Sequence, residues 1–343
     1  GAGEPAVAAP TERATSSYTV DRSMGPVLSF NTYNDIFHFL GEPTYGNIEG
    51  EQGDWEFVIT KLTEDSIFVK GKKWENEMVF TRMADGVDWT SYLDSIADVQ
   101  KRLGVNYSVG NSSDASKMVE INSATRRILS RTADGQMVEQ PFYVTSTGIH
   151  AVNEPVALGE DKAQDFLVSK AGVMTAKDNE DLTLNSYAPG IDTWVGEWTL
   201  SAMQGSCDMT ISKVEDQENM LKGTFTAGGY TYNIGLSFNP ETGALNLPSQ
   251  LIEDPSGRYP ALWLMNADLN QGTLLGQGGM NVVWHGVSQE GDFEDDGTLA
   301  SEGYASDSFV ALPCTADGEI IKENNQFVFV VEWYFLSNLT PNK

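Results

Sequence analysis

The chain has 343 residues, 40% of them hydrophobic, which is enough for ordinary globular cores, and its length predicts two domains. It carries 21 Lys and Arg against 49 Asp and Glu, a net charge of −28. This balance argues against nucleic acid and anionic membrane surfaces as partners, because both are recognised by clustered positive charge. Cations and neutral ligands such as glycans stay open.

Targeting and redox signals are few. No apolar run approaches the roughly 18 residues of a membrane-spanning helix. No signal peptide is legible, and the opening Gly1 is typical of a cleaved tag. The two cysteines, Cys207 and Cys314, fit either one disulfide or two buried thiols, so they assign no compartment.

The first half of the chain is predicted to be rich in strands. Residues 1–17 are small, Pro-containing and aperiodic, which indicates a flexible arm, and residues 18–190 form the first predicted domain. Its clearest pattern is Trp55–Thr60, where apolar and polar side chains alternate with the period of a half-buried strand. Further short apolar runs, joined by connections too short for parallel crossovers, predict the strands Val27–Phe30, Ile36–Leu40, Ile67–Val69, Met78–Phe80, Met118–Ile121, Arg127–Ser130 and Met137–Val144.

Two helices are predicted in this half. The first covers residues 89–103, with Asp88 as the N-cap, Gly104 as the stop and an apolar stripe that packs on the sheet. The second, with a weaker pattern, covers Asp161–Lys170.

The second predicted domain spans residues 191–343, after a boundary within 179–192 that contains Pro189-Gly190. It opens with Gly196-x-Trp198, as lipocalin-type barrels do. The alternation from Tyr230 to Phe238, a turn at 239–243 and an apolar last strand at Phe327–Leu336 continue a β-meander. The last strand is too apolar for an exposed edge, so it should be central or close a barrel.

These patterns predict a mostly β protein with two antiparallel β domains. The first carries one packed helix, and the second is a lipocalin-like barrel or a sandwich.

Catalytic signals are sparse. His38, His150 and His285 share no metal-ligand spacing with one another or with a cysteine, so we read them as core or surface histidines. No Gly-x-Ser-x-Gly elbow supports a serine hydrolase. Asp54 and Glu56 are close enough in the sequence to be considered as a catalytic carboxylate pair. They flank Trp55 on a strand, however, which favours a solvated edge over a glycosidase site.

An acidic segment resembles the start of a calcium loop. Asp292, Glu294 and Asp296 place oxygen ligands at alternate positions, and Gly297 follows at the sixth position. The twelfth position, which needs a glutamate, is Gly303. A calcium site and a solvated acidic loop are the two readings, and the second agrees better with these residues.

Aromatic residues outside the predicted core are candidates for ligand contact. Three tryptophans, Trp55, Trp284 and Trp333, fall on apolar strand faces and are predicted to be core. Trp74 lies among charged residues at a hairpin end, and Tyr45 lies in a glycine-rich loop. Because aromatic faces stack on the apolar faces of sugar rings, these two are the predicted ligand contacts.

Three segments resemble a known family. GPVLSFNTYNDIFHFLGEP from Gly25, GDWEFVI from Gly53 and DSIFVKGKKWENEMVF from Asp65 are similar to the Bacteroidetes lipoproteins grouped as domain-of-unknown-function family 4302. The resemblance covers residues 17–83 and extends less closely toward the Gly-x-Trp motif. It implies an exported protein of the outer membrane or cell surface, held by a lipid anchor absent from this chain, and genes near glycan-uptake systems. It implies no catalytic residue.

Three functional hypotheses follow. The first is a non-catalytic surface lipoprotein that binds glycan or a partner protein of a nutrient-uptake complex. The second is a structural or adhesive envelope protein without a small ligand. The third is a polysaccharide hydrolase, which would need two carboxyl groups roughly 5–10 Å apart in a cleft. A barrel with an apolar lumen would instead favour a lipid ligand.

Overall fold

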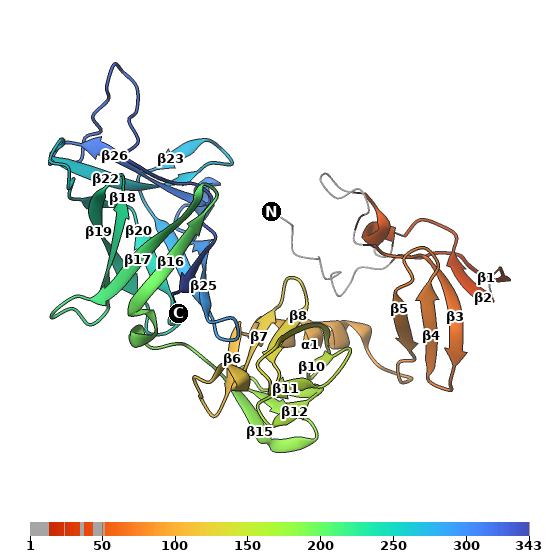
Figure 1. Cartoon of the computed structure of the whole chain (residues 1–343). Helices are drawn as coiled ribbons and strands as arrows, with labels where there is room; N and C mark the ends of the chain where they lie inside the picture. The colour runs from red at the N-terminus through yellow and green to blue at the C-terminus, as the bar shows by residue number, and fades with distance from the viewer. Residues whose placement is uncertain (1–13, 24, 35–37, 44–49, 51, 343) are drawn as a thin grey trace. The chain divides into compact units, whose positions relative to one another are not determined.

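The computed structural model describes residues 14–23, 25–34, 38–43, 50 and 52–342. The chain divides into two compact units, Gly1–Lys101 and Arg102–Lys343 (Figure 1). Antiparallel strands are the main regular structure of each unit, and one α-helix is present among the described residues, which confirms the predicted fold class. Among the described residues, no helix has both the length and the apolar character that crossing a membrane requires.

The first unit contains a five-stranded antiparallel sheet whose strands follow chain order. Phe57 is fully buried in it, and its ring makes edge contacts with Phe30 and Phe80 at centroid distances of 6.3 and 5.5 Å. The predicted strand Ile36–Leu40 is wrong over its described part, because residues 38–41 form a 3₁₀ turn, η1 (His38–Gly41). The strands are β1 (Tyr18–Arg22), β2 (Pro26–Phe30), β3 (Glu56–Leu62), β4 (Ser66–Gly71) and β5 (Glu77–Thr81).

The predicted helix forms as α1 (Trp89–Arg102). Asp88 caps it, since Asp88 Oδ2 accepts a hydrogen bond from the Ser91 N–H at 3.0 Å. Val99 is its fully buried residue. The cap and the helical spacing were both legible in the sequence.

The second unit begins with a closed eight-stranded barrel, the first barrel, in which β6 pairs with β15 and β9 with β10. The predicted helix Asp161–Lys170 is wrong. Phe166 and Val168 are buried while Leu167 is 43% exposed, so this segment has the period of a strand. The barrel strands are β6 (Asn106–Val109), β7 (Met118–Asn122), β8 (Arg127–Arg131), β9 (Met137–Val144), β10 (Gly148–Ala151), β13 (Asp165–Val168), β14 (Met174–Ala176) and β15 (Asn179–Ser186), and the pair β11 (Val156–Leu158) and β12 (Asp161–Ala163) lies outside it. Short 3₁₀ turns are η2 (Ala115–Lys117), η3 (Ile191–Trp194) and η4 (Ala300–Glu302).

A second closed eight-stranded barrel follows. The Gly-x-Trp motif contributes Trp198, which packs inside with Trp194 and Trp284 at centroid distances of 5.5 and 6.2 Å. The structure therefore selects the barrel among the two predicted alternatives. The strands are β16 (Gly196–Ala202), β17 (Gly205–Lys213), β18 (Met220–Ala227), β19 (Tyr230–Phe238), β20 (Leu245–Pro248), β24 (Gly279–His285), β25 (Glu290–Asp295) and β28 (Asn338–Pro341).

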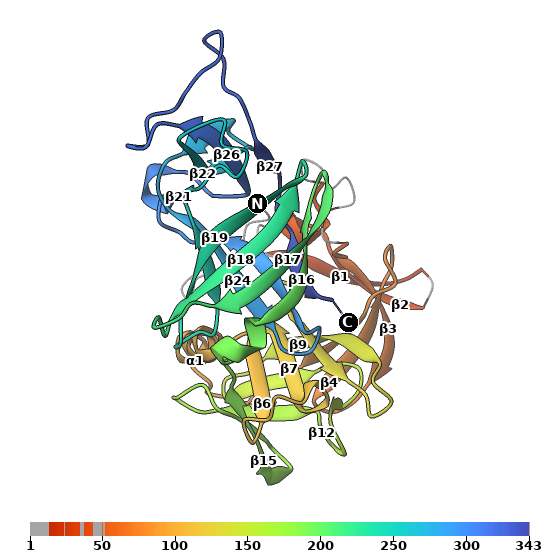
Figure 2. The ribbon, with the colours of Figure 1, turned by 60° about the vertical axis from the view of Figure 1, so that its left-hand side comes forward.

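A further sheet shares the core of the second barrel. Leu262, Phe309 and Trp333 from this sheet belong to the same buried cluster as the inward-facing barrel residues. Figure 2 shows β22 and β26 across one end of the barrel. The interior is thus filled by side chains. The strands of the sheet are β21 (Gln250–Ile252), β22 (Ala261–Asp268), β23 (Thr273–Leu275), β26 (Ser308–Cys314) and β27 (Val331–Trp333).

The end of the chain differs from its prediction. Within Phe327–Leu336 only β27 forms a strand, and Phe327 and Phe329 are 46% and 41% exposed. The strand that closes the barrel is β28, which pairs with β16 and β25. The predicted domain boundary at 190/191 falls at the connection between the two barrels, whereas the compact units divide at 101/102.

Candidate functional site

Of the two aromatic residues predicted to contact ligand, Trp74 lies among the described residues and Tyr45 does not. Trp74 lies in the turn between β4 and β5, is only partly exposed, and has Lys73 Nζ 4.3 Å from its ring centroid. Its indole N–H is buried and has no hydrogen-bond partner among the described residues. Tyr45 lies outside the described residues. Trp74 is therefore the one residue of this predicted pair that the structure describes.

Asp54 and Glu56 have separate structural roles. Asp54 is buried, and its carboxylate accepts hydrogen bonds from the backbone N–H groups of Lys73 at 2.8 Å and Trp74 at 3.1 Å. Glu56 pairs with Lys72, whose Nζ lies 3.0 Å from both carboxylate oxygens. The prediction of a solvated edge is wrong for Asp54, because its oxygens hold the β4–β5 turn in place.

The three predicted calcium ligands do not converge. Asp292 lies 3.3 Å from His285 Nε2, and Asp296 accepts a hydrogen bond from the Thr298 N–H at 2.9 Å. Glu294 is exposed on the strand between them. In the part of the chain that the structure describes, no three His, Cys, Asp or Glu side chains are grouped to hold a metal ion.

The three histidines occupy unrelated positions. His38 begins η1 and accepts a hydrogen bond from the Asn34 N–H at 3.3 Å, so it is not the strand residue predicted. His150 pairs with Asp165 across two strands of the first barrel at 2.9 Å. His285 lies between two carboxylates. Its Nδ1 is 3.2 Å from Glu120 of β7, and its Nε2 is 3.3 Å from Asp292 of β25.

His285 belongs to a buried junction between the two barrels of the second unit. Glu120 Oε1 accepts hydrogen bonds from the backbone N–H groups of Val287 at 2.5 Å and Ser288 at 3.0 Å. Asn106 Nδ2 donates to the Trp284 carbonyl at 2.5 Å, and Asn106 Oδ1 accepts from the Gly286 N–H at 2.9 Å. The first barrel thereby holds the β24–β25 turn through polar side chains.

This junction fixes the charge of His285. The Asp292 carboxylate first, and the Glu120 carboxylate second, raise the pKa of His285 to about 10, against the lowering effect of burial. The imidazole is therefore protonated at neutral pH. It acts as a structural cation between two carboxylates.

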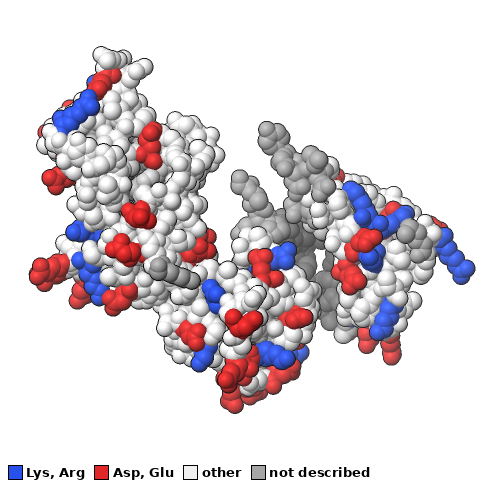
Figure 3. All heavy atoms as spheres, viewed as in Figure 1, with Lys and Arg blue, Asp and Glu red and all other residues white. Residues whose placement is uncertain are grey.

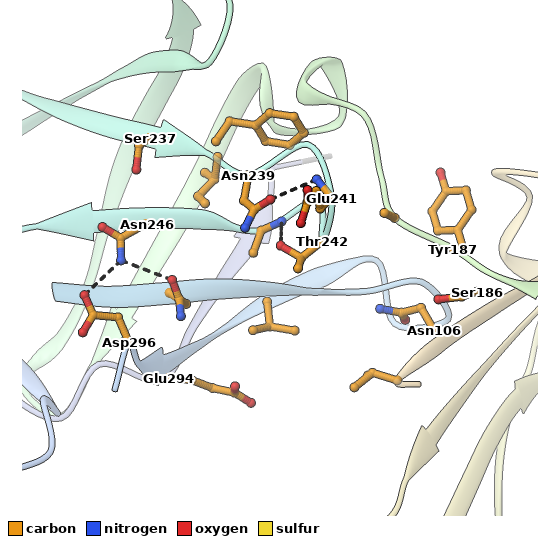
Figure 4. A pocket seen from close by; sticks show the side chains of 17 residues that line it. Asn106, Ser186, Tyr187, Ser237, Asn239, Glu241, Thr242, Asn246, Glu294 and Asp296 are labelled. Carbon is orange, nitrogen blue, oxygen red and sulfur yellow. Dashed lines mark hydrogen bonds between the residues drawn. The ribbon is translucent and has the colours of Figure 1, made fainter. Parts of the chain in front are cut away.

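An open cleft lies beside this junction, on the outside of the second barrel. Its volume is about 760 Å³. One wall is the chain that leaves β15, and the other is built from β19, β20, β24 and β25 with the turn 239–243 (Figure 4). The lining residues are Val105, Asn106, Ser186, Tyr187, Ala188, Ser237, Phe238, Asn239, Glu241, Thr242, Ala244, Leu245, Asn246, Asn281, Val283, Glu294 and Asp296.

A row of polar side chains crosses the strands of this cleft. Ser237 is the direct cross-strand partner of Asn246, Asn246 of Asn281, and Asn281 of Glu294. Since neighbouring strands are about 4.8 Å apart, the row is roughly 14 Å long. Asn246 Nδ2 donates to Asn281 Oδ1 at 3.2 Å and to Asp296 Oδ2 at 3.4 Å, which orients both amides (Figure 4).

The wall opposite this row is aromatic and is held by the barrel core. Tyr187 is partly buried, its backbone N–H donates to the Asn106 carbonyl at 2.9 Å, and burial raises the pKa of its phenol. The nearby turn is held by Trp194, whose indole N–H donates to the Gly243 carbonyl at 2.8 Å. A side chain at Gly243 would collide with Pro189, 2.3 Å from the position of a Cβ, so this close approach requires glycine.

The cleft is acidic. Among the described residues, those that line it include three carboxylates and no Lys, Arg or His. Acidic side chains are also scattered over the visible face of each unit in Figure 3. The cleft thus offers hydrogen-bonding amides, hydroxyls and carboxylates together with an aromatic wall, and it would repel an anionic ligand.

Sequence reasoning named two residues of this cleft, Glu294 and Asp296, but as calcium ligands, and it missed the cleft itself. Asn246 and Asn281 are 35 positions apart, because β20 pairs with β24 across the intervening β21, β22 and β23. A local signal does exist, since each of these asparagines lies between two apolar residues that point inward. That pattern marks an outward side chain but not its neighbour on the next strand.

Fold and site define a protein of two antiparallel β-barrels and an additional β-sheet unit, with an open polar cleft on the second barrel. Residues 6–170, just under half of the chain, match the profile of a family described as domain of unknown function (DUF4302). The match covers the five-stranded sheet, α1 and most of the first barrel. No curated protein and no solved structure matches the chain.

Proposed function

We propose that the protein is a non-catalytic glycan-binding protein and that the cleft on the second barrel is its binding site. The observation that carries this proposal is the row Ser237, Asn246, Asn281 and Glu294, which places hydrogen-bonding groups at regular strand spacing along an open surface. A saccharide presents hydroxyl groups that both donate and accept, so amide and carboxylate side chains are matched partners.

The aromatic wall completes this chemistry. A sugar ring has an apolar C–H face, and Tyr187 offers an aromatic surface at the end of the cleft away from Asp296 (Figure 4). A lipid is the poorer candidate, because the inward-facing residues of the second barrel pack into one continuous core. The cleft is a partly open depression rather than an enclosed cavity, which suits a sugar chain better than an enclosed small molecule.

The proposed setting follows from the resemblance of the first unit. We place the protein on the outer membrane or cell surface, attached through a lipid anchor, as a component of a nutrient-uptake complex. An envelope protein that docks on the same cleft without glycan is the alternative partner.

The test combines a glycan array with matched thermal-shift measurements on the wild type, Asn246→Ala and Asn281→Ala. We expect at least one neutral polysaccharide to bind, and each variant to weaken its binding about tenfold, the equivalent of roughly 1.4 kcal/mol. Trp74→Ala, measured in parallel, tests the contact predicted from the sequence.

The matched control is Asn233→Ala. Asn233 is an exposed, outward-facing asparagine on β19 whose side chain accepts a hydrogen bond from Thr224, and it is not among the residues that line the cleft. It should bind glycan as the wild type does. Equal glycan binding by all the asparagine variants would exclude the cleft as the binding site. If no polysaccharide binds, the structural or adhesive hypothesis would be favoured instead. Cleavage of a bound glycan would favour the hydrolase.

A further inference from the structure

Three neighbouring rings lie beside the five-stranded sheet in the first unit. His38 stacks on Trp55 with ring centroids 5.3 Å apart and an interplanar angle of 19°. Tyr33 continues the group, 5.3 Å from His38 with an interplanar angle of 38°. We call Tyr33, His38 and Trp55 the aromatic shelf.

The aromatic shelf is held in place from below by backbone contacts. The Gly53 N–H donates to the Leu40 carbonyl at 2.9 Å, which ties η1 to the segment before β3. Gly41 lies so close to Trp55 that a Cβ at Gly41 would be 2.8 Å from the indole ring. The stack is therefore pre-organised by close packing rather than assembled from flexible side chains.

Part of each outer ring is exposed. Tyr33 is 56% exposed and Trp55 is 37% exposed, although the sequence pattern predicted Trp55 to be core. They border a depression of about 360 Å³ together with polar residues of β2 and β3. The lining residues are Ser29, Phe30, Asn31, Tyr33, His38, Trp55 and Glu56.

The polar rim of this depression is also oriented in advance. Glu56 accepts a hydrogen bond from Ser29 Oγ at 3.3 Å and pairs with Lys72 at 3.0 Å. Asn31 Nδ2 donates to Thr19 Oγ1 at 3.1 Å. A fixed carboxylate and a fixed amide therefore border an exposed aromatic face.

We infer that the aromatic shelf is a second saccharide site, which takes one or two units of a neutral sugar chain with a sugar ring on the exposed part of Tyr33 or of Trp55. An exposed aromatic face beside hydrogen-bonding side chains matches a pyranose, which has an apolar face and polar edges. A purely apolar ligand would displace water from Glu56 and Asn31 and would offer these side chains no hydrogen bonds in its place. This inference rests on the proposed function for its ligand class, but it uses none of the residues of the cleft.

The experiment uses the full chain and a panel of soluble hexasaccharides of glucose, xylose and mannose. The indole N–H signal of Trp55 is assigned in a ¹H–¹⁵N NMR spectrum by its loss in Trp55→Phe. We expect a binding hexasaccharide to shift this signal, and Tyr33→Ala to weaken the affinity read from it at least tenfold. Tyr33→Phe, which keeps the ring, should bind as the wild type does.

Two controls separate this site from the cleft. Tyr143→Ala removes a comparably exposed tyrosine, 52% exposed and 4.9 Å from the ring of His150, and should leave the Trp55 shift unchanged. The cleft variants Asn246→Ala and Asn281→Ala should also leave it unchanged.

Each outcome decides between the two sites. Binding that the cleft variants weaken, with an unmoved Trp55 signal, would overturn the shelf and keep the proposed function. A Trp55 shift that Tyr33→Ala abolishes, with normal binding in the cleft variants, would keep the shelf and remove the cleft. No binding by any hexasaccharide would overturn both.

Discussion

Asp54 shows how a single buried carboxylate can organise a turn. Both of its oxygens accept backbone N–H groups, from Lys73 and Trp74, and Gly71 leaves no room for a side chain beside it, since a Cβ would lie 2.0 Å from Asp54 Oδ2. A methyl group at position 54 would leave two backbone donors without their partner.

We therefore expect Asp54→Ala to lower the free energy of unfolding by about 2 kcal/mol. The amides of Lys73 and Trp74 should exchange their hydrogens faster, which native-state hydrogen exchange measures directly. Asp85→Ala is the control, because Asp85 has a 93% exposed side chain that pairs with Arg82 at 3.3 Å on the surface. Unchanged exchange at both amides in Asp54→Ala would contradict this role.

The two cysteines are both free thiols in the structure, Cys207 on β17 and Cys314 on β26. Burial first, and the charge of Asp208 second, raise the pKa of Cys207 to about 11, and burial raises the pKa of Cys314. Because the thiolate is the reactive form, both sulfurs should be slow nucleophiles at neutral pH.

With Ellman's reagent at pH 8 we expect slow modification of the native chain and rapid release of two equivalents in guanidinium chloride. The mass of the intact chain should not change on reduction. Rapid reaction of one equivalent under native conditions would contradict the burial, and no reaction in denaturant would indicate a disulfide.

At the scale of elements, the segment before β27 separates two kinds of aromatic residue. Phe327 and Phe329 are exposed beside each other, with ring centroids 6.5 Å apart, and Lys322 lies 4.4 Å from the ring of Phe327. Trp333, only a few residues later, is buried with its ring 4.6 Å from Phe225. The apolar alternation that joins them in the sequence does not correspond to one strand face.

We expect Phe327→Ala to change the free energy of unfolding by less than about 0.5 kcal/mol, as for other exposed positions. Trp333→Ala should cost about 3 kcal/mol, because it opens a cavity in the core of the second barrel. Urea unfolding followed by circular dichroism compares the two variants. An equal loss of unfolding free energy in the two variants would contradict this difference and would favour the continuous strand predicted from the sequence.

At the scale of the whole molecule, the junction around His285 joins the two barrels of the second unit. The pKa of His285 is raised from 6.5 to about 10. Between these two pH values the folded chain therefore binds a proton that the unfolded chain releases. The stabilisation is complete below pH 6.5 and is lost as the pH rises toward 10.

His285→Asn should remove this pH dependence. In urea titrations from pH 6 to pH 10 we expect the wild type to lose stability relative to the variant, with a slope of up to about 1.4 kcal/mol per pH unit in mid-window. Glu120→Gln, which leaves Asp292 as the remaining carboxylate, should reduce the difference in slope. Parallel curves for wild type and His285→Asn would show that this histidine is not protonated in the folded chain.

Much of the local structure can be read from the order of apolar, polar and capping residues. Alternation in Tyr230–Phe238 predicted β19, the Asp88 cap and helical spacing predicted α1, and Gly196-x-Trp198 indicated the second barrel. These signals are readable because the period of apolar residues follows directly from the geometry of a strand or a helix.

The candidate sites, in contrast, depend on contacts between segments that are far apart in the sequence. The polar row of the cleft depends on the pairing of β20 with β24, and the aromatic shelf depends on η1 folding back against Trp55. The first barrel and the His285 junction likewise depend on which strands meet. Local periodicity reports which face of an element is apolar, but the contacts that bring two distant polar or aromatic faces together are set by packing of the whole unit.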